Sequence, residues 1–118
     1  MAGNSVTLVG NLVRDPELGR TDGGRAVLNL RVAVDEAGGS RSDAGFFDCV
    51  AWGDIAENLA RSLSKGPRVL VTGELRHRTY AAGGESRSVT EVRVFDAGPS
   101  LLWAIAMVEK RAPALAGS

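Results

Sequence analysis

Hydrophobic and polar residues alternate with a period of two over several short segments, and this pattern predicts β-strands. Glycine-, proline- or serine-rich stretches separate the segments and predict turns. In the fourth segment, Gly73 predicts a bend or bulge, because glycine in a strand interior weakens regular pairing. The five predicted strands are residues 5–13, 26–34, 46–52, 68–80 and 87–95.

The alternation also assigns each side chain to one face of its strand. In the second strand, one face carries Leu28, Leu30, Val32 and Val34, and the other carries Val27, Asn29, Arg31 and Ala33. In the third strand, one face carries Phe47, Cys49 and Ala51, and the other carries Phe46, Asp48, Val50 and Trp52. The purely apolar faces predict a core, and the mixed faces predict a surface open to solvent or a ligand.

Residues 54–63 instead carry apolar residues at helical spacing, which predicts one amphipathic helix that packs on the domain. Asp54 is the predicted N-cap, with Glu57 three residues later as in a capping box, and Gly66-Pro67 ends the helix. The order of three strands, a helix and two strands predicts an all-β domain with one helix. It fits a five-stranded OB-fold barrel, although other small barrels share the order.

The chain is long enough for one domain, which we assign to residues 1–110, followed by a short frayed tail at 111–118. The apolar segment 101–108 is too short to span a membrane. We assign Trp103, inside this segment, to the core or to a subunit interface. The N-terminus lacks the features of a signal peptide, so we expect a cytoplasmic protein with no membrane association.

Catalytic and metal chemistry are not indicated. Cys49 is the only cysteine and lies on the predicted core face, and His77 is the only histidine. A metal site or a nucleophile–base pair needs several such groups together. The glycines form no phosphate-binding motif. We therefore expect a protein that is not an enzyme, with no cofactor and no metal.

The formal net charge is zero, with 14 basic and 14 acidic residues, which by itself does not favour a nucleic-acid-binding protein. The distribution of the charges changes this picture. All basic residues except Lys65 and Lys110 are arginines, and arginine stacks on aromatic rings as well as carrying charge.

Aromatic and basic residues share the same predicted strand faces, and this combination is typical of proteins that bind single-stranded nucleic acid. Phe46 and Trp52 share one face of the third strand, and Arg76, Arg78 and Tyr80 share one face of the fourth. Taken singly, a buried tryptophan or a solvated arginine row has an ordinary structural explanation, so the prediction rests on the conjunction. The further basic candidates are Arg14, Arg31, Lys65, Arg68, Arg87 and Arg93.

With these segments in place, the chain resembles the bacterial single-stranded DNA-binding protein family, and especially its actinobacterial members. The similar segments include LVGNLVRDPE at 8–17, AVLNL at 26–30, FFDCVAW at 46–52, GELR at 73–76, RTY at 78–80, TEV at 90–92 and GPSL at 98–101. The resemblance implies an OB-fold and sequence-tolerant binding of single-stranded DNA in replication, repair or recombination, at the nucleoid. It also implies stacking positions at Phe46, Trp52 and Tyr80, and a homotetramer in which first strands pair.

Some positions depart from the family pattern. A stacking aromatic that is common after the second strand has no counterpart at 35–38, and Phe46 and Tyr80 stand where tryptophan is often found. Asp48 and Asp54 stand near places where many relatives carry a basic or neutral residue. Because each base stack contributes about 1–3 kcal/mol, these departures predict weaker or more salt-sensitive binding.

Family members usually continue into a long tail with an acidic, phenylalanine-tipped end that recruits partner proteins. Residues 114–118 read ALAGS, with no acidic tip, so recruitment through such a peptide is not predicted. Two alternatives therefore stay open: an oligomerising protein-interaction paralogue that modulates a full-length relative, and a module that binds single-stranded RNA through the same rings.

Overall fold

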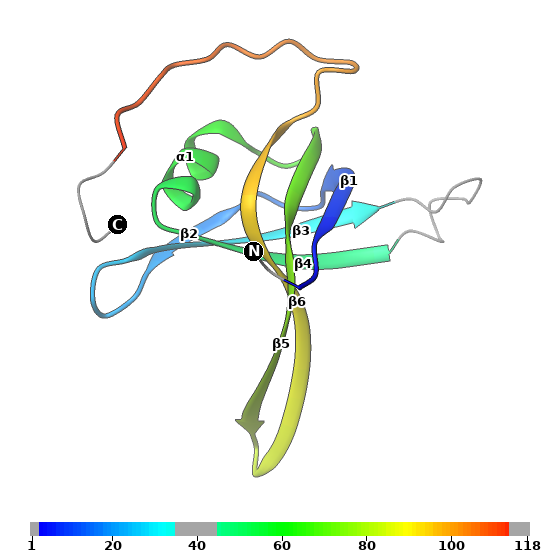
Figure 1. The fold of residues 1–118 in the computed structure, drawn as a ribbon, viewed down its shortest axis with the longest axis vertical. Coiled ribbons are helices and arrows are strands. Elements are labelled where there is room, and N and C mark those ends of the chain that lie inside the picture. The colour runs from blue at the N-terminus through cyan, green and yellow to red at the C-terminus, as the bar shows by residue number, and fades with distance from the viewer. Residues whose placement is uncertain (1–2, 35–44, 114–118) are drawn as a thin grey trace.

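The computed structural model describes residues 3–34 and 45–113, which form one helix and a six-stranded sheet. Figure 1 shows the helix beside the curved sheet and a long hairpin that projects from it. In chain order, the elements are β1 (Val6–Leu12), β2 (Glu17–Arg20), β3 (Ala26–Val34), β4 (Gly45–Trp52), α1 (Asp54–Ser62), β5 (Arg68–Ala82) and β6 (Glu85–Pro99).

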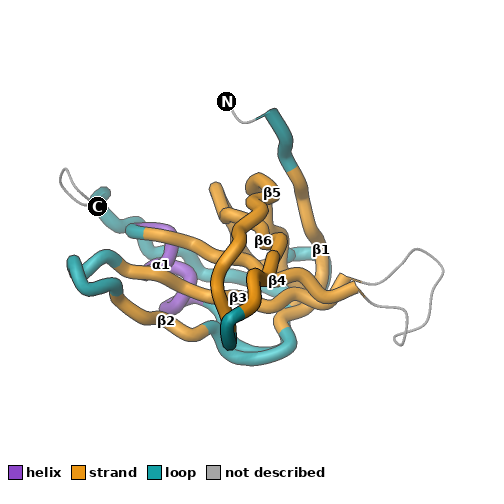
Figure 2. The backbone as a smooth tube through the Cα atoms, turned by 90° about the horizontal axis from the view of Figure 1, so that it is seen from below, coloured by secondary structure: helices purple, strands orange, loops and turns teal. Residues whose placement is uncertain are grey.

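Five of the strands close into a ring. The sheet order is β1-β5-β6-β4-β3-β2, and the ring closes because β1 also pairs with β3 at Asn11↔Ala33 and Leu12↔Val32. Only the β4–β6 contact is parallel; the other pairs are antiparallel. This is the predicted five-stranded barrel, with α1 against β2 and β3 at one side (Figure 2).

The sixth strand, β2, was not predicted and lies outside the ring, on the edge of β3. It pairs antiparallel with β3 from Glu17↔Asn29 to Arg20↔Ala26. All its residues are exposed, so it carries no alternation between buried and exposed positions. A strand of this kind leaves no hydrophobic pattern from which it can be predicted.

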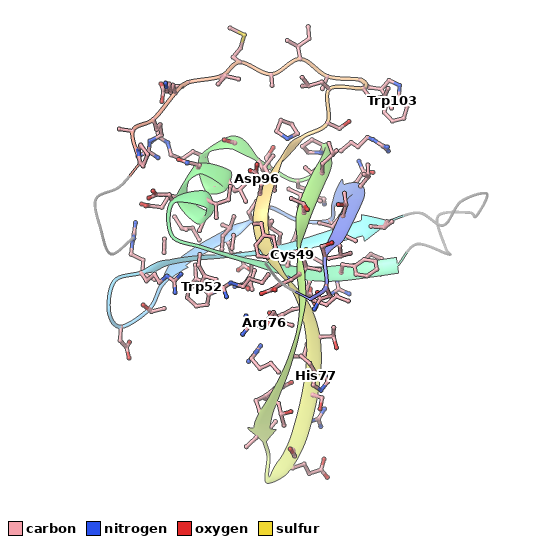
Figure 3. The ribbon with its side chains drawn as sticks, in the orientation of Figure 1. Cys49, Trp52, Arg76, His77, Asp96 and Trp103 are labelled. Atoms are coloured by element: carbon pink, nitrogen blue, oxygen red, sulfur yellow. The ribbon has the colours of Figure 1, made fainter. Side chains whose placement is uncertain are left out.

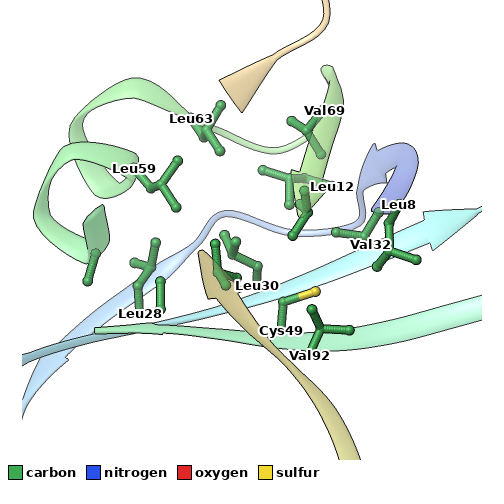
Figure 4. Close-up of a cluster of buried hydrophobic side chains, with 14 of the residues drawn as sticks. Leu8, Leu12, Leu28, Leu30, Val32, Cys49, Leu59, Leu63, Val69 and Val92 are labelled. Carbon is green, nitrogen blue, oxygen red and sulfur yellow. The ribbon is translucent and has the colours of Figure 1, made fainter. Parts of the chain in front are cut away.

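The core consists of the inner faces predicted from the alternation, closed at one end by the helix. Leu28, Leu30, Cys49 and Ala51 are buried as expected, and Leu59 of α1 packs against them (Figure 4). Cys49 is only 1% exposed, and burial, followed by the nearby charges of Asp48 and Glu91, raises the pKa of its thiol to about 12. The thiol is therefore protonated at neutral pH, as expected of a core residue.

The predicted N-cap of the helix is wrong by one residue. The N-cap is Gly53, with φ 75° and no side-chain capping bond, and Asp54 is the first residue of α1. The Glu57 N–H donates to the Gly53 carbonyl (3.2 Å). The sharp turn out of β4 requires a positive φ, which glycine adopts without strain, so Gly53 takes this position. Asp54 and Glu57 remain in the first turn, where they favour the helix dipole.

The predicted irregularity at Gly73 is confirmed. The β5–β6 register shifts between Thr72 and Gly73, and a Cβ at Gly73 would collide with the Arg93 carbonyl. The missing side chain therefore lets β6 approach at the bend. Beyond Gly73 the two strands continue as a hairpin that projects from the barrel to the Gly83-Gly84 turn, where both glycines have positive φ (Figure 1).

Residues 101–113, which we call the C-terminal arm, form neither helix nor strand and pass over the α1 side of the barrel (Figure 1). Trp103 is 78% exposed, so its assignment to the core of the chain is wrong, and the interface assignment stays a prediction. The arm is tied down at its end, where Arg111 donates to the Asn58 side chain (2.8 Å). The predicted boundary after residue 110 is not tested, and residues 114–118 lie outside the described residues. The helix in the described part of the chain is not one that could cross a membrane.

Candidate nucleic-acid interface

A cavity of about 560 Å³ lies between the open face of β3 and β4 and the projecting hairpin. From the barrel it is lined by Val27 and Asn29 of β3 and by Val50 and Trp52 of β4. These four residues were all assigned to the open faces by alternation, and that assignment is confirmed. From the other side it is lined by Arg76, His77 and Arg78 of β5 and by Glu91 and Arg93 of β6.

Trp52 provides the aromatic surface of this cavity. Its side chain is half-buried, which excludes the alternative that it belongs to the core. Register places it opposite Val27 on the neighbouring strand. The Arg25 guanidinium lies over the ring, 4.9 Å from its centroid, a distance typical of a cation–π contact.

Most of the positive charge of the cavity comes from the hairpin, and Arg25, just before β3, adds to it. Across the two strands of the hairpin, Arg76 lies opposite Glu91 and Arg93 lies opposite Glu74. These four side chains therefore share one face of the hairpin. In Figure 3, the Arg76 side chain lies on the same side of the hairpin as Trp52, whereas the His77 side chain points to the other side, although His77 is among the lining residues. The His77 ring contacts the Thr90 hydroxyl (3.3 Å). This contact gives His77 an ordinary surface role.

The other two predicted aromatics extend this surface in opposite directions without lining the cavity. Phe46 is 55% exposed and lies six residues before Trp52 on the same face of β4. Tyr80 is 43% exposed near the hairpin tip, opposite Arg87 in register. We refer to Phe46, Trp52 and Tyr80, with the arginines beside them, as the aromatic face.

Five of the eight predicted basic residues do not line the cavity. Arg31 lies over Phe46 and Arg87 lies opposite Tyr80. The other three are Arg68, Arg14 and Lys65. Arg68 begins β5, opposite Asn11, at the end of the strand remote from the hairpin tip. Arg14 is exposed after β1, and the backbone N–H of Lys65 donates to the Asp15 carboxylate (2.7 Å). Their part in binding stays a prediction. Arg25, in contrast, was missed, because it stands in a turn where no alternation assigns a direction.

The aromatic face carries carboxylates as well as arginines. Arg31 is paired with Asp48 (2.9 Å), Arg76 with Glu74 (3.3 Å) and Arg78 with Glu91 (3.1 Å). Arg25 and Arg93 take part in none of these three pairs. The face is therefore charged in both signs but richer in arginine. The described part of the chain contains no group of three or more metal-binding side chains.

Exposed rings beside arginines on the open face of a small closed barrel define a class of protein, the β-barrel domains that bind single-stranded nucleic acid. Comparison with known proteins identifies the family within this class. Residues 3–98 match the single-strand binding protein family. The chain therefore belongs to this family, whose OB-fold agrees with the ring of strands, and whose members are DNA-binding proteins rather than enzymes.

Among its relatives are the single-stranded DNA-binding proteins of several actinobacteria. The chain is 46% identical to that of Mycobacterium leprae, over 93% of this chain and 71% of the relative. It is 46% identical to that of Mycolicibacterium smegmatis, over 93% of this chain and 72% of the relative. For Corynebacterium glutamicum the identity is 45%, over 90% of this chain and 51% of the relative. The resemblance noted from the sequence is confirmed.

Proposed function

We propose that this protein binds single-stranded DNA with little sequence preference, stacking bases on Trp52, Phe46 and Tyr80 and pairing phosphates with arginines of the hairpin. The observation that carries the proposal is the cavity, which brings Trp52 of the barrel together with Arg76, Arg78 and Arg93. Every base has a π-face and every nucleotide linkage a charge, so this combination holds a strand without reading its sequence.

The placement of the three rings supports a path for the strand. Phe46 and Trp52 lie on one face of β4, and Tyr80 continues the hairpin face that carries Arg76 and Arg78. A strand that runs along β4, through the cavity and out along the hairpin meets a ring and an arginine at each stage. Arg87, opposite Tyr80, offers a further phosphate contact at the outer end.

We further infer a homotetramer, in which β1 pairs with its copy. Two observations support this. Along one edge β1 pairs with β5, but on the other edge it pairs with β3 only at Asn11 and Leu12, so residues 6–10 keep an unpaired edge within the described chain. The C-terminal arm also exposes apolar residues that a second subunit would cover. Protection of single strands in replication, repair or recombination, in the cytoplasm at the nucleoid, is the cellular role that follows.

The proposal is tested by fluorescence anisotropy of a labelled oligo-dT titrated with the protein at several salt concentrations. We expect the logarithm of the affinity to fall linearly with the logarithm of salt, with a slope of about −0.7 per phosphate contacted. Unlabelled oligo-dA and oligo-dC should compete within about tenfold of oligo-dT, and duplex DNA much less. Absence of binding at low salt would refute the proposal. Stronger competition by oligo-U than by oligo-dT would favour the RNA-binding alternative.

A further inference from the structure

Each of the three stacking rings is covered by an arginine of the same chain. The guanidinium lies 4.9 Å from the ring centroid for Arg25 on Trp52, 5.0 Å for Arg31 on Phe46 and 5.6 Å for Arg78 on Tyr80. A base that stacks on any of these rings must displace the arginine or share the ring with it. The rings are thus occupied before DNA arrives.

Two of these three arginines are also held by a carboxylate. Arg31 and Asp48 lie directly opposite each other on β3 and β4 and form an ion pair of 2.9 Å. The Arg78 Nε donates to Glu91 (3.1 Å), whose side chain is only 17% exposed and lines the cavity. Both pairs therefore hold the arginine against its ring and, at the same time, occupy the charge that a phosphate would use.

We propose that Asp48 and Glu91 set the DNA affinity of this protein by holding Arg31 and Arg78 over Phe46 and Tyr80, so that DNA binds only by displacing these carboxylates from their arginines. The inference rests on the proposed function and adds its regulation within the site. The two carboxylates stand in for backbone phosphates in the free protein. They oppose DNA binding in two ways, because each neutralises an arginine and each repels an incoming phosphate.

This arrangement has a consequence for salt dependence. An arginine that is already paired holds no anion from solution, and the carboxylate that it leaves behind takes up a cation when DNA binds. Both effects reduce the net release of ions, so the affinity of the wild-type protein should depend less steeply on salt than the number of arginines on the aromatic face indicates. Removing a carboxylate should make the dependence steeper.

The test compares Asp48→Asn and Glu91→Gln with the wild-type chain, using oligo-dT titrations over a range of salt. Glu57→Gln is the matched control, because Glu57 is also paired with an arginine, Arg20, at 2.9 Å, but that arginine covers no ring. We expect each of the first two variants to bind about 3- to 10-fold more tightly at low salt. The salt slope should steepen in each, because no carboxylate is left to take up a cation when DNA binds. Glu57→Gln should stay within about twofold, with its slope unchanged.

Several outcomes would overturn the inference. Equal or weaker binding by Asp48→Asn and Glu91→Gln would mean that the carboxylates position the arginines for phosphate instead of competing with it. An equal gain in oligo-dT affinity in Glu57→Gln would mean that the effect comes from the change in net charge alone. A gain in only one variant would overturn the assignment of the other carboxylate. Thermal melts verify that each variant is folded. If Asp48→Asn or Glu91→Gln does not fold, Asp48→Ser or Glu91→Ser is used in its place. A wild-type chain that fails to bind oligo-dT refutes the proposed function itself, before any variant is compared.

Discussion

The aromatic face and the C-terminal arm both expose large apolar side chains, but their surroundings differ. On the aromatic face, Phe46, Trp52 and Tyr80 each lie under an arginine, and further arginines line the cavity. In the arm, residues 101–108 include no charged residue, and within the described chain only Arg68 forms a cation–π contact with its tryptophan. Exposed rings among cations suit a base and its phosphate, whereas an uncharged exposed segment suits another protein surface.

We therefore expect Trp52 to serve DNA binding and Trp103 to serve subunit association. Trp52 is half-buried in a cavity with hairpin arginines, and Trp103 is 78% exposed on a segment without regular structure. Under the proposed function, the same residue type would serve two kinds of recognition, and the side chains beside it would decide which. Substitutions in the two regions should consequently separate DNA binding from subunit association.

The largest effect is expected in the arm. Trp103→Ala should weaken subunit association by about 2–4 kcal/mol, because tryptophans that become buried in an interface contribute most to its energy. Sedimentation equilibrium measures the change. Leu18→Ala is the control, since Leu18 is an exposed apolar residue on β2, outside the arm. If Trp103→Ala associates as the wild-type protein does, the arm is not a subunit interface.

On the aromatic face, Trp52→Ala should reduce the affinity for oligo-dT by about 1–3 kcal/mol, the contribution of one stacked base. Anisotropy titration at a single moderate salt concentration is sufficient. The oligomeric state of Trp52→Ala should be unchanged, which is the converse of the expectation for Trp103→Ala. A Trp52→Ala protein with wild-type affinity would place the bases elsewhere.

In the core beneath the aromatic face, Cys49 should make the stability of the protein depend on pH, an effect of similar size that involves no ligand. The folded pKa of Cys49 is raised to about 12, above its ordinary value of 9.0, so its contribution to stability is complete below pH 9 and is lost as pH rises toward 12. Through this group the free energy of unfolding should be about 1.4 kcal/mol lower near pH 10 than at neutral pH. Urea unfolding of the wild-type protein and of Cys49→Ala at both pH values isolates the contribution of Cys49 to the free energy of unfolding. An identical pH dependence in the two proteins would contradict it.

The smallest effect should distinguish arginines within the cavity from those outside it. Arg76→Ala should reduce the steepness of the salt dependence by at most about 0.7, because one phosphate contact is lost and Arg76 is already paired with Glu74. Arg14→Ala, at the exposed turn after β1, should reduce it less. If the salt dependence falls equally in both variants, the DNA path extends across the barrel to the β1 end. That result would confirm the wider set of basic residues predicted from the sequence.

Much of the site could be predicted because alternation is a property of the backbone. Once residues 26–34 and 46–52 form strands, Asn29 and Trp52 must point away from Leu28 and Ala51. The closing of the ring follows less directly, since it depends on pairing between strands far apart in the chain. The helix of the barrel was predicted from its apolar spacing, and only its cap differed, because Gly53 makes the turn.

The features that could not be predicted lack a periodic pattern or depend on distant partners. Arg25 lies in a turn and reaches Trp52 only because β3 pairs with β4. The pairing of Arg78 with Glu91 depends on the hairpin register. Trp103 was partly misassigned for a different reason. An apolar run indicates burial but does not say whether the covering surface belongs to the same chain.

The most direct test uses the fact that the chain has two tryptophans, one in each region. Trp103→Phe leaves Trp52 as the only tryptophan, and Trp52→Phe leaves Trp103. Oligo-dT should quench the fluorescence of the Trp103→Phe protein, because a base stacks on Trp52, and should leave that of the Trp52→Phe protein unchanged. Quenching of Trp103 with no change at Trp52 would contradict the account and move DNA binding to the arm.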